Sequence, residues 1–148
     1  MKKRKRDARK KLTSIPVINR RLFRLASLVC RENANDTCEI CGTKKGDLYK
    51  GTNKSQRVEA HHVMSRSNKN SPLKFDIRNL VCLCTNCHKF SRKSAHKHGL
   101  WFAKWFFKNR SKDADFILEN DEIEVNLQDR SNLSYIENCL KHKEFMDY

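Results

Sequence analysis

Two short cysteine pairs, Cys38-Glu-Ile-Cys41 and Cys84-Thr-Asn-Cys87, decide the fold of this chain. Each pair has the Cys-x-x-Cys spacing in which two sulfurs converge on one ion, and two such pairs make a four-thiolate zinc site. Gly42 follows the first pair and supplies the permissive backbone that such a turn needs. Two redox dithiols, or four unrelated buried thiols, are the alternatives. The spacing favours a structural zinc ion that joins two distant segments of the chain.

Three further cysteines, Cys30, Cys82 and Cys139, have no such partner spacing, and we expect them to be small buried apolar residues. Cys82 is close to the second pair, but Cys84 has the right spacing to Cys87. The basic start of the chain is not followed by the clean apolar stretch of a secretory signal. We therefore expect a cytoplasmic protein that is not secreted.

The composition points to one domain with tails and a basic surface. The chain has 148 residues, of which 38% are hydrophobic, so the core should be modest. No stretch approaches the roughly 18–20 apolar residues of a membrane helix, which excludes a transmembrane protein. The formal net charge is +15, which indicates a polyanionic partner, either nucleic acid or an anionic membrane surface.

The charge is divided unevenly along the chain. Residues 1–112 carry a net charge of +22, whereas residues 113–148 carry a net charge of −7. Such asymmetry suggests a basic binding body followed by an acidic segment. Eight of the ten residues 2–11 are Lys or Arg, and such a like-charge block predicts a disordered arm. The arm would bind DNA phosphates, serve as a nuclear address, or be a solvated tail.

Hydrophobic periodicity predicts a mixed set of helices and strands. Ile18, Leu22, Leu25 and Val29 recur on one helix face. Residues 43–56 are polar and contain glycine, which predicts a loop or loose hairpin. The same reasoning predicts strands at 57–64 and 77–83, a helix that begins near Cys87 and His88, and further helices near 17–32, 100–107, 113–119 and 132–146.

Histidines and an asparagine lie between the cysteine pairs and directly after the second pair. The motifs are Cys38-Glu-Ile-Cys41-Gly42, Ala60-His61-His62-Val63, Asn79-Leu80 and Leu83-Cys84-Thr-Asn-Cys87-His88. Their order resembles the HNH endonuclease superfamily, the His-Me-finger or ββα-metal nucleases, in a zinc-bearing form of phage and bacterial type. The resemblance covers about residues 34–95.

The resemblance implies an α+β fold, with a small zinc-stapled ββα-metal core that is treble-clef-like and has flanking helices. It divides the chain into four parts. These are a basic arm at 1–13, an N-terminal helix at 14–33, an HNH nuclease domain at 34–110 and an acidic helical segment at 111–148.

The resemblance also implies roles for individual residues. His62 would be the general base that takes a proton from water, while His61 and His88 would hold one catalytic divalent metal. Asn79 would orient His62 or position the loop that bears the metal. The family often has Asp at the position that His61 occupies here, so His61 is a departure from the family pattern. A site without that carboxylate is softer than a usual Mg²⁺ site, and Mn²⁺, Ni²⁺ or Zn²⁺ would serve at least as well.

The function that these observations favour is a metal-dependent HNH endonuclease or nickase that hydrolyses DNA phosphodiester bonds. The alternative is a non-catalytic zinc-finger DNA-binding protein, such as a recombination or packaging factor, and RNA is a further alternative partner because charge alone does not separate it from DNA. The candidate nucleic-acid contacts are Arg66 and Arg78 near the site, and the arm residues Lys2, Lys3, Arg4, Lys5 and Arg6.

Several other residues have two interpretations. His96 and His98 would either be ordinary surface histidines or contact DNA or a metal ion. The aromatic residues Trp101, Phe102, Trp105 and Phe106 would either fill the core or stack on bases. Their helical spacing favours the core.

Overall fold

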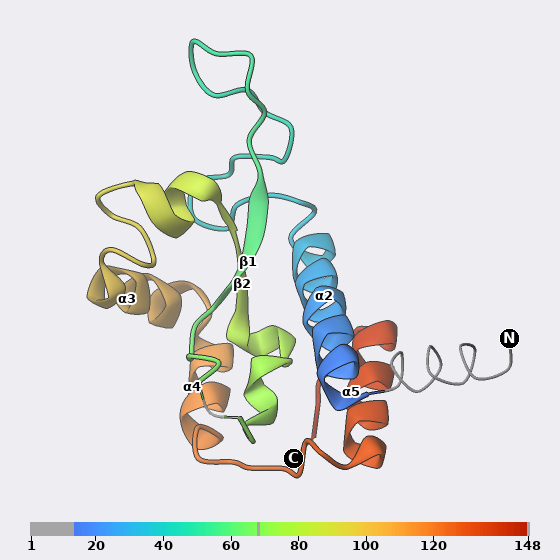
Figure 1. Cartoon of the computed structure of the whole chain (residues 1–148). Coiled ribbons are helices and arrows are strands. Elements are labelled where there is room, and N and C mark those ends of the chain that lie inside the picture. Colours follow the sequence, from blue (N-terminus) through green and yellow to red (C-terminus); the bar gives the residue numbers. More distant parts are fainter. Residues whose placement is uncertain (1–13, 68, 148) are drawn as a thin grey trace, which may run out of the picture.

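A computed structural model describes residues 14–67 and 69–147, so the arm residues at positions 2–6 lie outside the described part. Figure 1 shows a two-stranded hairpin between helices. The helices are α2 (Ile15–Asn33), α3 (Gly99–Asn109), α4 (Ser111–Glu119) and α5 (Arg130–His142), and the strands are β1 (Val58–His62) and β2 (Leu80–Cys84). Three short helical turns, η1 (Pro72–Lys74), η2 (Ile77–Asn79) and η3 (Asn86–Phe90), complete the fold.

The two strands pair antiparallel, with Val58 opposite Cys84 and His62 opposite Leu80. Every residue of β2 is buried, which fits its apolar sequence Leu-Val-Cys-Leu-Cys. α2 packs against both strands. The mixed α+β class predicted from the sequence is therefore confirmed, and the cysteine cluster lies beside the hairpin.

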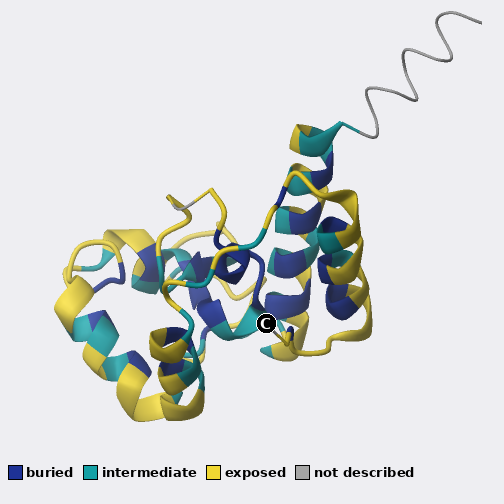
Figure 2. Ribbon diagram, turned by 90° about the horizontal axis from the view of Figure 1, so that it is seen from below, coloured by how far each residue is buried: buried dark blue, intermediate teal, exposed yellow. Residues whose placement is uncertain are grey.

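α2 and α5 pack against each other through apolar faces. Ile18, Leu22 and Val29 are buried on α2, as the periodicity predicts, and Pro16 stands in the first turn. Figure 2 shows the buried faces of the helices turned towards one another and towards the strands. On α5 the buried residues include Leu133, Ile136 and Leu140. The acidic segment thus contributes a core helix rather than a solvated tail.

Several element boundaries differ from the predicted ones. The predicted strand 77–83 begins only at Leu80, because the side chain of Asp76 accepts a hydrogen bond from the backbone N–H of Arg78 and caps a helical turn there. The helix predicted near 100–107 extends from Gly99 to Asn109. The predicted loose hairpin at 43–56 is present, with isolated bridges from Thr37 to Lys44 and from Leu48 to Ser55.

The aromatic residues of α3 divide between core and surface. Phe102 and Phe106 are buried, as the core interpretation predicts. Trp101 and Trp105 are half-buried and line a shallow groove with Lys104 and Lys108. Within residues 14–67 and 69–147, no helix is both long enough and apolar enough to cross a membrane.

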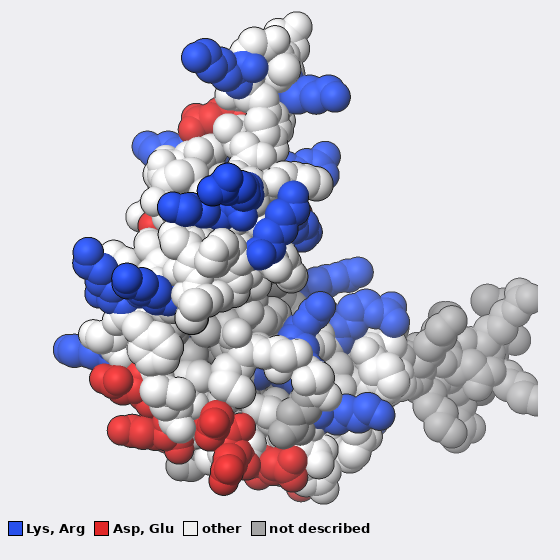
Figure 3. All heavy atoms as spheres, turned by 90° about the vertical axis from the view of Figure 1, so that its left-hand side faces the viewer, with Lys and Arg blue, Asp and Glu red and all other residues white. Residues whose placement is uncertain are grey.

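Acidic side chains are concentrated at one end of the face that Figure 3 shows. Figure 3 shows acidic side chains gathered at the end of this face where Figure 1 places α4, with lysines and arginines over the rest. The segregation agrees with the net charge of −7 over residues 113–148.

Candidate metal centres

The two cysteine pairs meet in space. The sulfurs of Cys38, Cys41, Cys84 and Cys87 all lie within 4.8 Å of one another. The Sγ atoms of Cys41 and Cys84 are 3.6 Å apart. Tetrahedral Zn–S bonds of about 2.3 Å place two sulfurs about 3.8 Å apart, so the donor set and its spacing fit zinc.

Local backbone geometry forms the first cysteine turn. The backbone N–H of Gly42 donates to the carbonyl of Cys38, and Gly42 has a φ of 74°, in the left-handed region that favours glycine. A hydrogen bond from Cys87 lowers the pKa of Cys38 to about 4. The same contact raises the pKa of Cys87. The cluster therefore stabilises a thiolate, which is the form that binds metal.

The cysteines outside the cluster are buried. Burial raises the pKa of Cys30 to about 12 and that of Cys82 to about 12, so both remain protonated thiols. Cys139 is buried on α5. The cluster contains Cys84 and not Cys82, in agreement with the spacing of the sequence motif.

A second cluster contains three histidines, His61, His88 and His96, whose ligand atoms also lie within 4.8 Å of one another. The Nε2 atoms of His88 and His96 are 3.0 Å apart. Two nitrogen ligands at about 2.1 Å from an ion and 90° apart are separated by about 3.0 Å, so this pair fits a divalent metal.

The three histidines come from different parts of the chain. His61 is on β1, and its ring centroid lies 5.0 Å from that of His88 and 5.1 Å from that of His96. His88 follows Cys87 in η3, so the cysteine cluster fixes its position. The loop after η3 then folds back, because the backbone N–H of His96 donates to the carbonyl of His88.

The sequence left the role of His96 open, and the structure brings it beside His88. His96 follows His88 by eight positions, and helical periodicity does not bring the two together because a loop follows Phe90 at the end of η3. The N–H of Ala95 donates to the carbonyl of Cys87 at 2.8 Å, which helps return the loop to η3. No short sequence motif predicts that the loop after η3 returns to it. The structure does not place His98 in the cluster; it caps α3 by accepting a hydrogen bond from Trp101.

Glu59 supports the histidine cluster from behind. Its Oε2 atom lies 2.7 Å from Nδ1 of His88 and also accepts a hydrogen bond from Nζ of Lys89 at 2.7 Å. This contact occupies Nδ1 and leaves Nε2 of His88 facing the other histidines. Burial lowers the pKa of His88, and burial and the neighbouring histidines lower that of His61 to about 3. Both rings are therefore neutral at pH 7, as metal ligation requires.

His62 is the last residue of β1, and its Nε2 atom lies 2.9 Å from the carbonyl oxygen of Lys74. A carbonyl only accepts hydrogen bonds, so Nε2 carries the proton, and the neutral ring has its lone pair on Nδ1. Neighbouring strand residues normally point to opposite faces. Because the strand ends at His62, both His61 and His62 line one cavity.

That cavity has a volume of about 680 Å³ and lies between α2, the end of β1 and α3. Arg66, one of the two predicted phosphate contacts, lines it, together with Lys89. The residues that α2 and α3 contribute are Phe23, Ser27, Gly99, Phe102 and Ala103.

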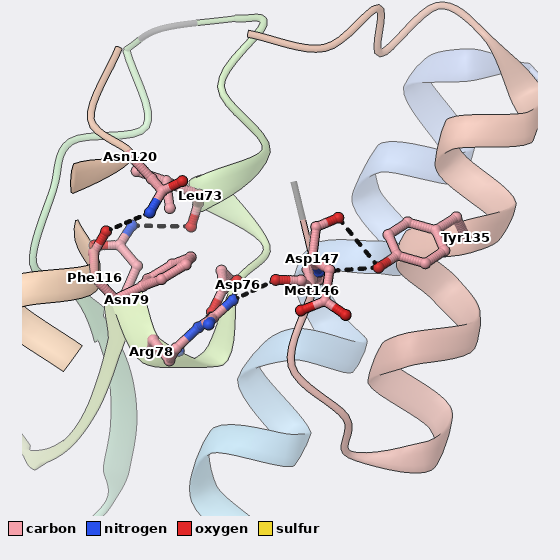
Figure 4. Close-up of polar contacts among 9 residues, drawn as sticks. All are labelled: Leu73, Asp76, Arg78, Asn79, Phe116, Asn120, Tyr135, Met146 and Asp147. Atoms are coloured by element: carbon pink, nitrogen blue, oxygen red, sulfur yellow. Dashed lines mark hydrogen bonds and ion pairs between the residues drawn. The ribbon is translucent and has the colours of Figure 1, made fainter. Parts of the chain in front are cut away.

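Asn79 is buried and holds the loop before it (Figure 4). Its Oδ1 accepts a hydrogen bond from the backbone N–H of Met64 at 2.7 Å, and its Nδ2 donates to the carbonyl of Leu73 at 3.0 Å. These contacts fit the predicted loop-positioning role. No hydrogen bond joins Asn79 to His62 among the described residues, so direct orientation of His62 is not the geometry found.

Arg78, the other predicted phosphate contact, is engaged elsewhere (Figure 4). Its guanidinium pairs with Asp76 at 2.8 Å, donates to the carbonyl of Met146 and lies 3.2 Å from the ring centroid of Phe116. It does not line the histidine cavity. Arg78 therefore joins η2 to α4 and to the segment after α5, and we do not assign it to nucleic acid.

Comparison with known proteins identifies the segment that carries the cysteine cluster and two of the three clustered histidines. Residues 38–93 match the HNH endonuclease family, and this range holds both cysteine pairs, His61, His62, Asn79 and His88. His96 lies just outside it. No curated protein and no solved structure matches the chain. The segment 38–93, with its four-cysteine cluster, belongs to the HNH endonuclease family.

Proposed function

We propose that this protein is a metal-dependent endonuclease or nickase that hydrolyses phosphodiester bonds in DNA. The observation that carries the proposal is the shared cavity of His62 and the three-histidine cluster. A phosphodiester is anionic and resists attack, so its hydrolysis needs an activated water and a cation against the developing charge. The cavity provides a base and a metal-fitting cluster side by side.

His62 is the general base of this proposal. Its Nε2 atom is held by the carbonyl of Lys74, so Nδ1 takes a proton from water. The water oxygen then bonds to phosphorus, the bond to the leaving oxygen breaks, and that oxygen acquires a proton. Burial and the neighbouring Arg66 lower the pKa of His62, which keeps it neutral near pH 7.

The histidine cluster is the proposed site of the catalytic metal. A divalent ion held by His61, His88 and His96 would offset the negative charge that develops on the phosphate. Its all-nitrogen donors favour Mn²⁺, Ni²⁺ or Zn²⁺ over Mg²⁺. Cys38, Cys41, Cys84 and Cys87 would hold a structural Zn²⁺ that fixes η3 and therefore His88.

The surface charge supports a nucleic-acid substrate. The net charge of +15 and Arg66 in the cavity favour phosphate binding. We propose DNA as the substrate and assign the arm residues 1–13 to additional phosphate contacts. In this proposal residues 34–110 form the nuclease domain, and residues 14–33 and 111–148 flank it.

A plasmid assay tests the proposal. Supercoiled DNA is incubated with the protein and Mg²⁺, Mn²⁺, Ni²⁺ or Zn²⁺, with EDTA as the control, and relaxed or linear products are quantified. We expect His62→Ala to lower the cleavage rate by about 10²- to 10⁴-fold, as loss of a general base does. DNA affinity should stay nearly unchanged, because it comes from the Lys/Arg surface.

The matched control is His142→Ala, which removes an exposed histidine at the end of α5. Cleavage by His62→Ala at the rate of His142→Ala would contradict the assignment of the base. A wild-type protein that binds DNA and cleaves nothing with any of the four ions would instead be a DNA-binding module. Cleavage confined to an RNA substrate would replace DNA in the proposal.

A further inference from the structure

A second cavity, of about 400 Å³, opens along α2 beside the histidine cavity. Four of its lining residues are arginines: Arg20, Arg24, Arg31 and Arg66. The other two are Phe23 and Ser27, so the described lining contains no acidic side chain. We refer to these six residues as the arginine groove.

The helix repeat explains the groove. Residues 20, 24, 27 and 31 are spaced by four, three and four positions, which places them on one face of α2. The buried face, with Ile18 and Leu22, packs on the core. Arg21 stands on another side of the helix and pairs with Glu137 of α5.

The groove arginines are largely available to a ligand. Arg20 and Arg24 are exposed, and neither has an ion-pair partner within the described residues. Arg31 has only a long contact, 3.9 Å, with Asp36. Like charges gathered without counter-charges repel one another, and a bound polyanion relieves that repulsion.

The arginine groove continues into the histidine cavity. Phe23, Ser27 and Arg66 line both spaces. The guanidinium carbon of Arg66 lies 5.4 Å from the ring centroid of Phe23, so this pair forms the junction between them. A bound polyanionic strand that reaches the histidine cluster and passes this junction would therefore run along the arginines of α2.

We propose that the arginine groove binds the phosphate backbone of one nucleic-acid strand next to the bond that is cleaved. Arginine matches phosphate with paired hydrogen bonds. At 1.5 Å per residue, the row from Arg20 to Arg31 is about 16 Å long, and that length of duplex axis holds about five phosphates of one strand. The identity of the ligand rests on the proposed nuclease function, whereas α2 itself lies outside the family match at 38–93.

The test measures binding without added divalent ion, so that cleavage does not enter. A fluorescent duplex DNA is titrated with the wild type, with Arg20→Ala/Arg24→Ala, and with Arg21→Ala/Lys141→Ala, over a series of salt concentrations. The last variant removes the same charge from the ion-pair group around Glu137. Melting curves verify that both variants fold.

Counterion release predicts that loss of two phosphate contacts makes the salt slope shallower by about 1.8. We expect this change, with at least about tenfold weaker binding at 0.1 M salt, for Arg20→Ala/Arg24→Ala only. An equal change in both variants would show a general charge effect and overturn the proposal. Binding of the groove to vesicles of anionic lipid but not to DNA would overturn it too. If the wild type cleaves no plasmid but Arg20→Ala/Arg24→Ala still weakens DNA binding selectively, the nuclease function alone is refuted.

Discussion

Glu59 is the carboxylate that fixes the ring of His88, through the 2.7 Å contact between Oε2 and Nδ1. Carboxylates behind a metal-binding histidine raise its basicity and fix its orientation, and their loss costs about 10- to 100-fold in metal affinity. We expect a loss of this size for Glu59→Ala. Glu59→Gln should lose less, because the amide oxygen still accepts a hydrogen bond from Nδ1. Calorimetric titration with Mn²⁺ or Ni²⁺ measures both.

The matched control for Glu59 is Lys89→Met, which removes the ion pair of Lys89 with Glu59 and leaves the contact to His88 in place. Its metal affinity should stay within about threefold of the wild type, since an exposed ion pair contributes little. If Glu59→Ala and Lys89→Met weaken metal binding equally, the contact between Glu59 and His88 does not determine the metal affinity.

At the scale of residues, sequence reasoning found the members of short motifs and missed their supports. His61, His62 and His88 stand next to one another or to a cysteine, so a pattern reveals them. In the sequence Glu59 is an ordinary polar residue of a predicted strand, and only the fold shows that it contacts His88. His96 needs the return of the loop after η3, which rests on backbone hydrogen bonds rather than on a residue signature.

At the scale of elements, the side chain of Asn79 holds the loop between the two strands in place through hydrogen bonds to its backbone. Asn79 is buried, and its side chain bonds backbone groups of Met64 and Leu73. Asn79→Ala leaves these two groups without their partner, at a cost of about 1–3 kcal/mol each, so we expect the free energy of unfolding to fall by about 2–6 kcal/mol. Urea unfolding measures the loss.

A comparison with Lys69→Ala, an exposed position in the same loop, separates this effect from a change in loop composition. Asn79→Asp is a second variant, because its carboxylate oxygen still accepts a hydrogen bond from the N–H of Met64, whereas the Nδ2 donor to the carbonyl of Leu73 is lost. We expect it to be destabilised as well. If Asn79→Ala unfolds at the same urea midpoint as Lys69→Ala, the hydrogen bonds of Asn79 do not stabilise the loop.

Strand and helix patterns predicted the elements better than their ends. β2 was expected from residue 77, but Asp76 caps a turn that delays the strand to Leu80. The predicted helix at Cys87 is only η3, which ends at Phe90, and the following loop returns to η3 through backbone hydrogen bonds of Ala95 and His96. Apolar periodicity describes which face is buried, and it carries little information about side-chain caps or returning loops.

At the scale of the whole molecule, the acidic segment carries part of the core. Leu133, Ile136, Leu140 and Met146 are each at most 2% exposed. Complete burial of such side chains contributes about 1.5–3 kcal/mol each, so together they match the whole stability of a small domain. We expect a chain truncated after residue 130 to be unfolded or insoluble, as judged by circular dichroism and sedimentation.

Removal of residue 148 alone is the control for that truncation, and it should leave the fold intact. A truncated chain that stays folded and binds DNA more tightly would contradict the core role. It would indicate instead that the acidic segment masks the basic body.

The hairpin at 43–56 separates the two halves of the cysteine cluster, with Cys38 and Cys41 before it and Cys84 and Cys87 after it. Its tip, around Gly51 and Thr52, is exposed, as sites that tolerate chain cleavage are. A specific protease site inserted there would yield two fragments that share one zinc ion. We expect them to migrate together on gel filtration, and a strong chelator should weaken that association. The proposed zinc ion would then hold the two fragments of a split protein together, so that metal controls their reassembly.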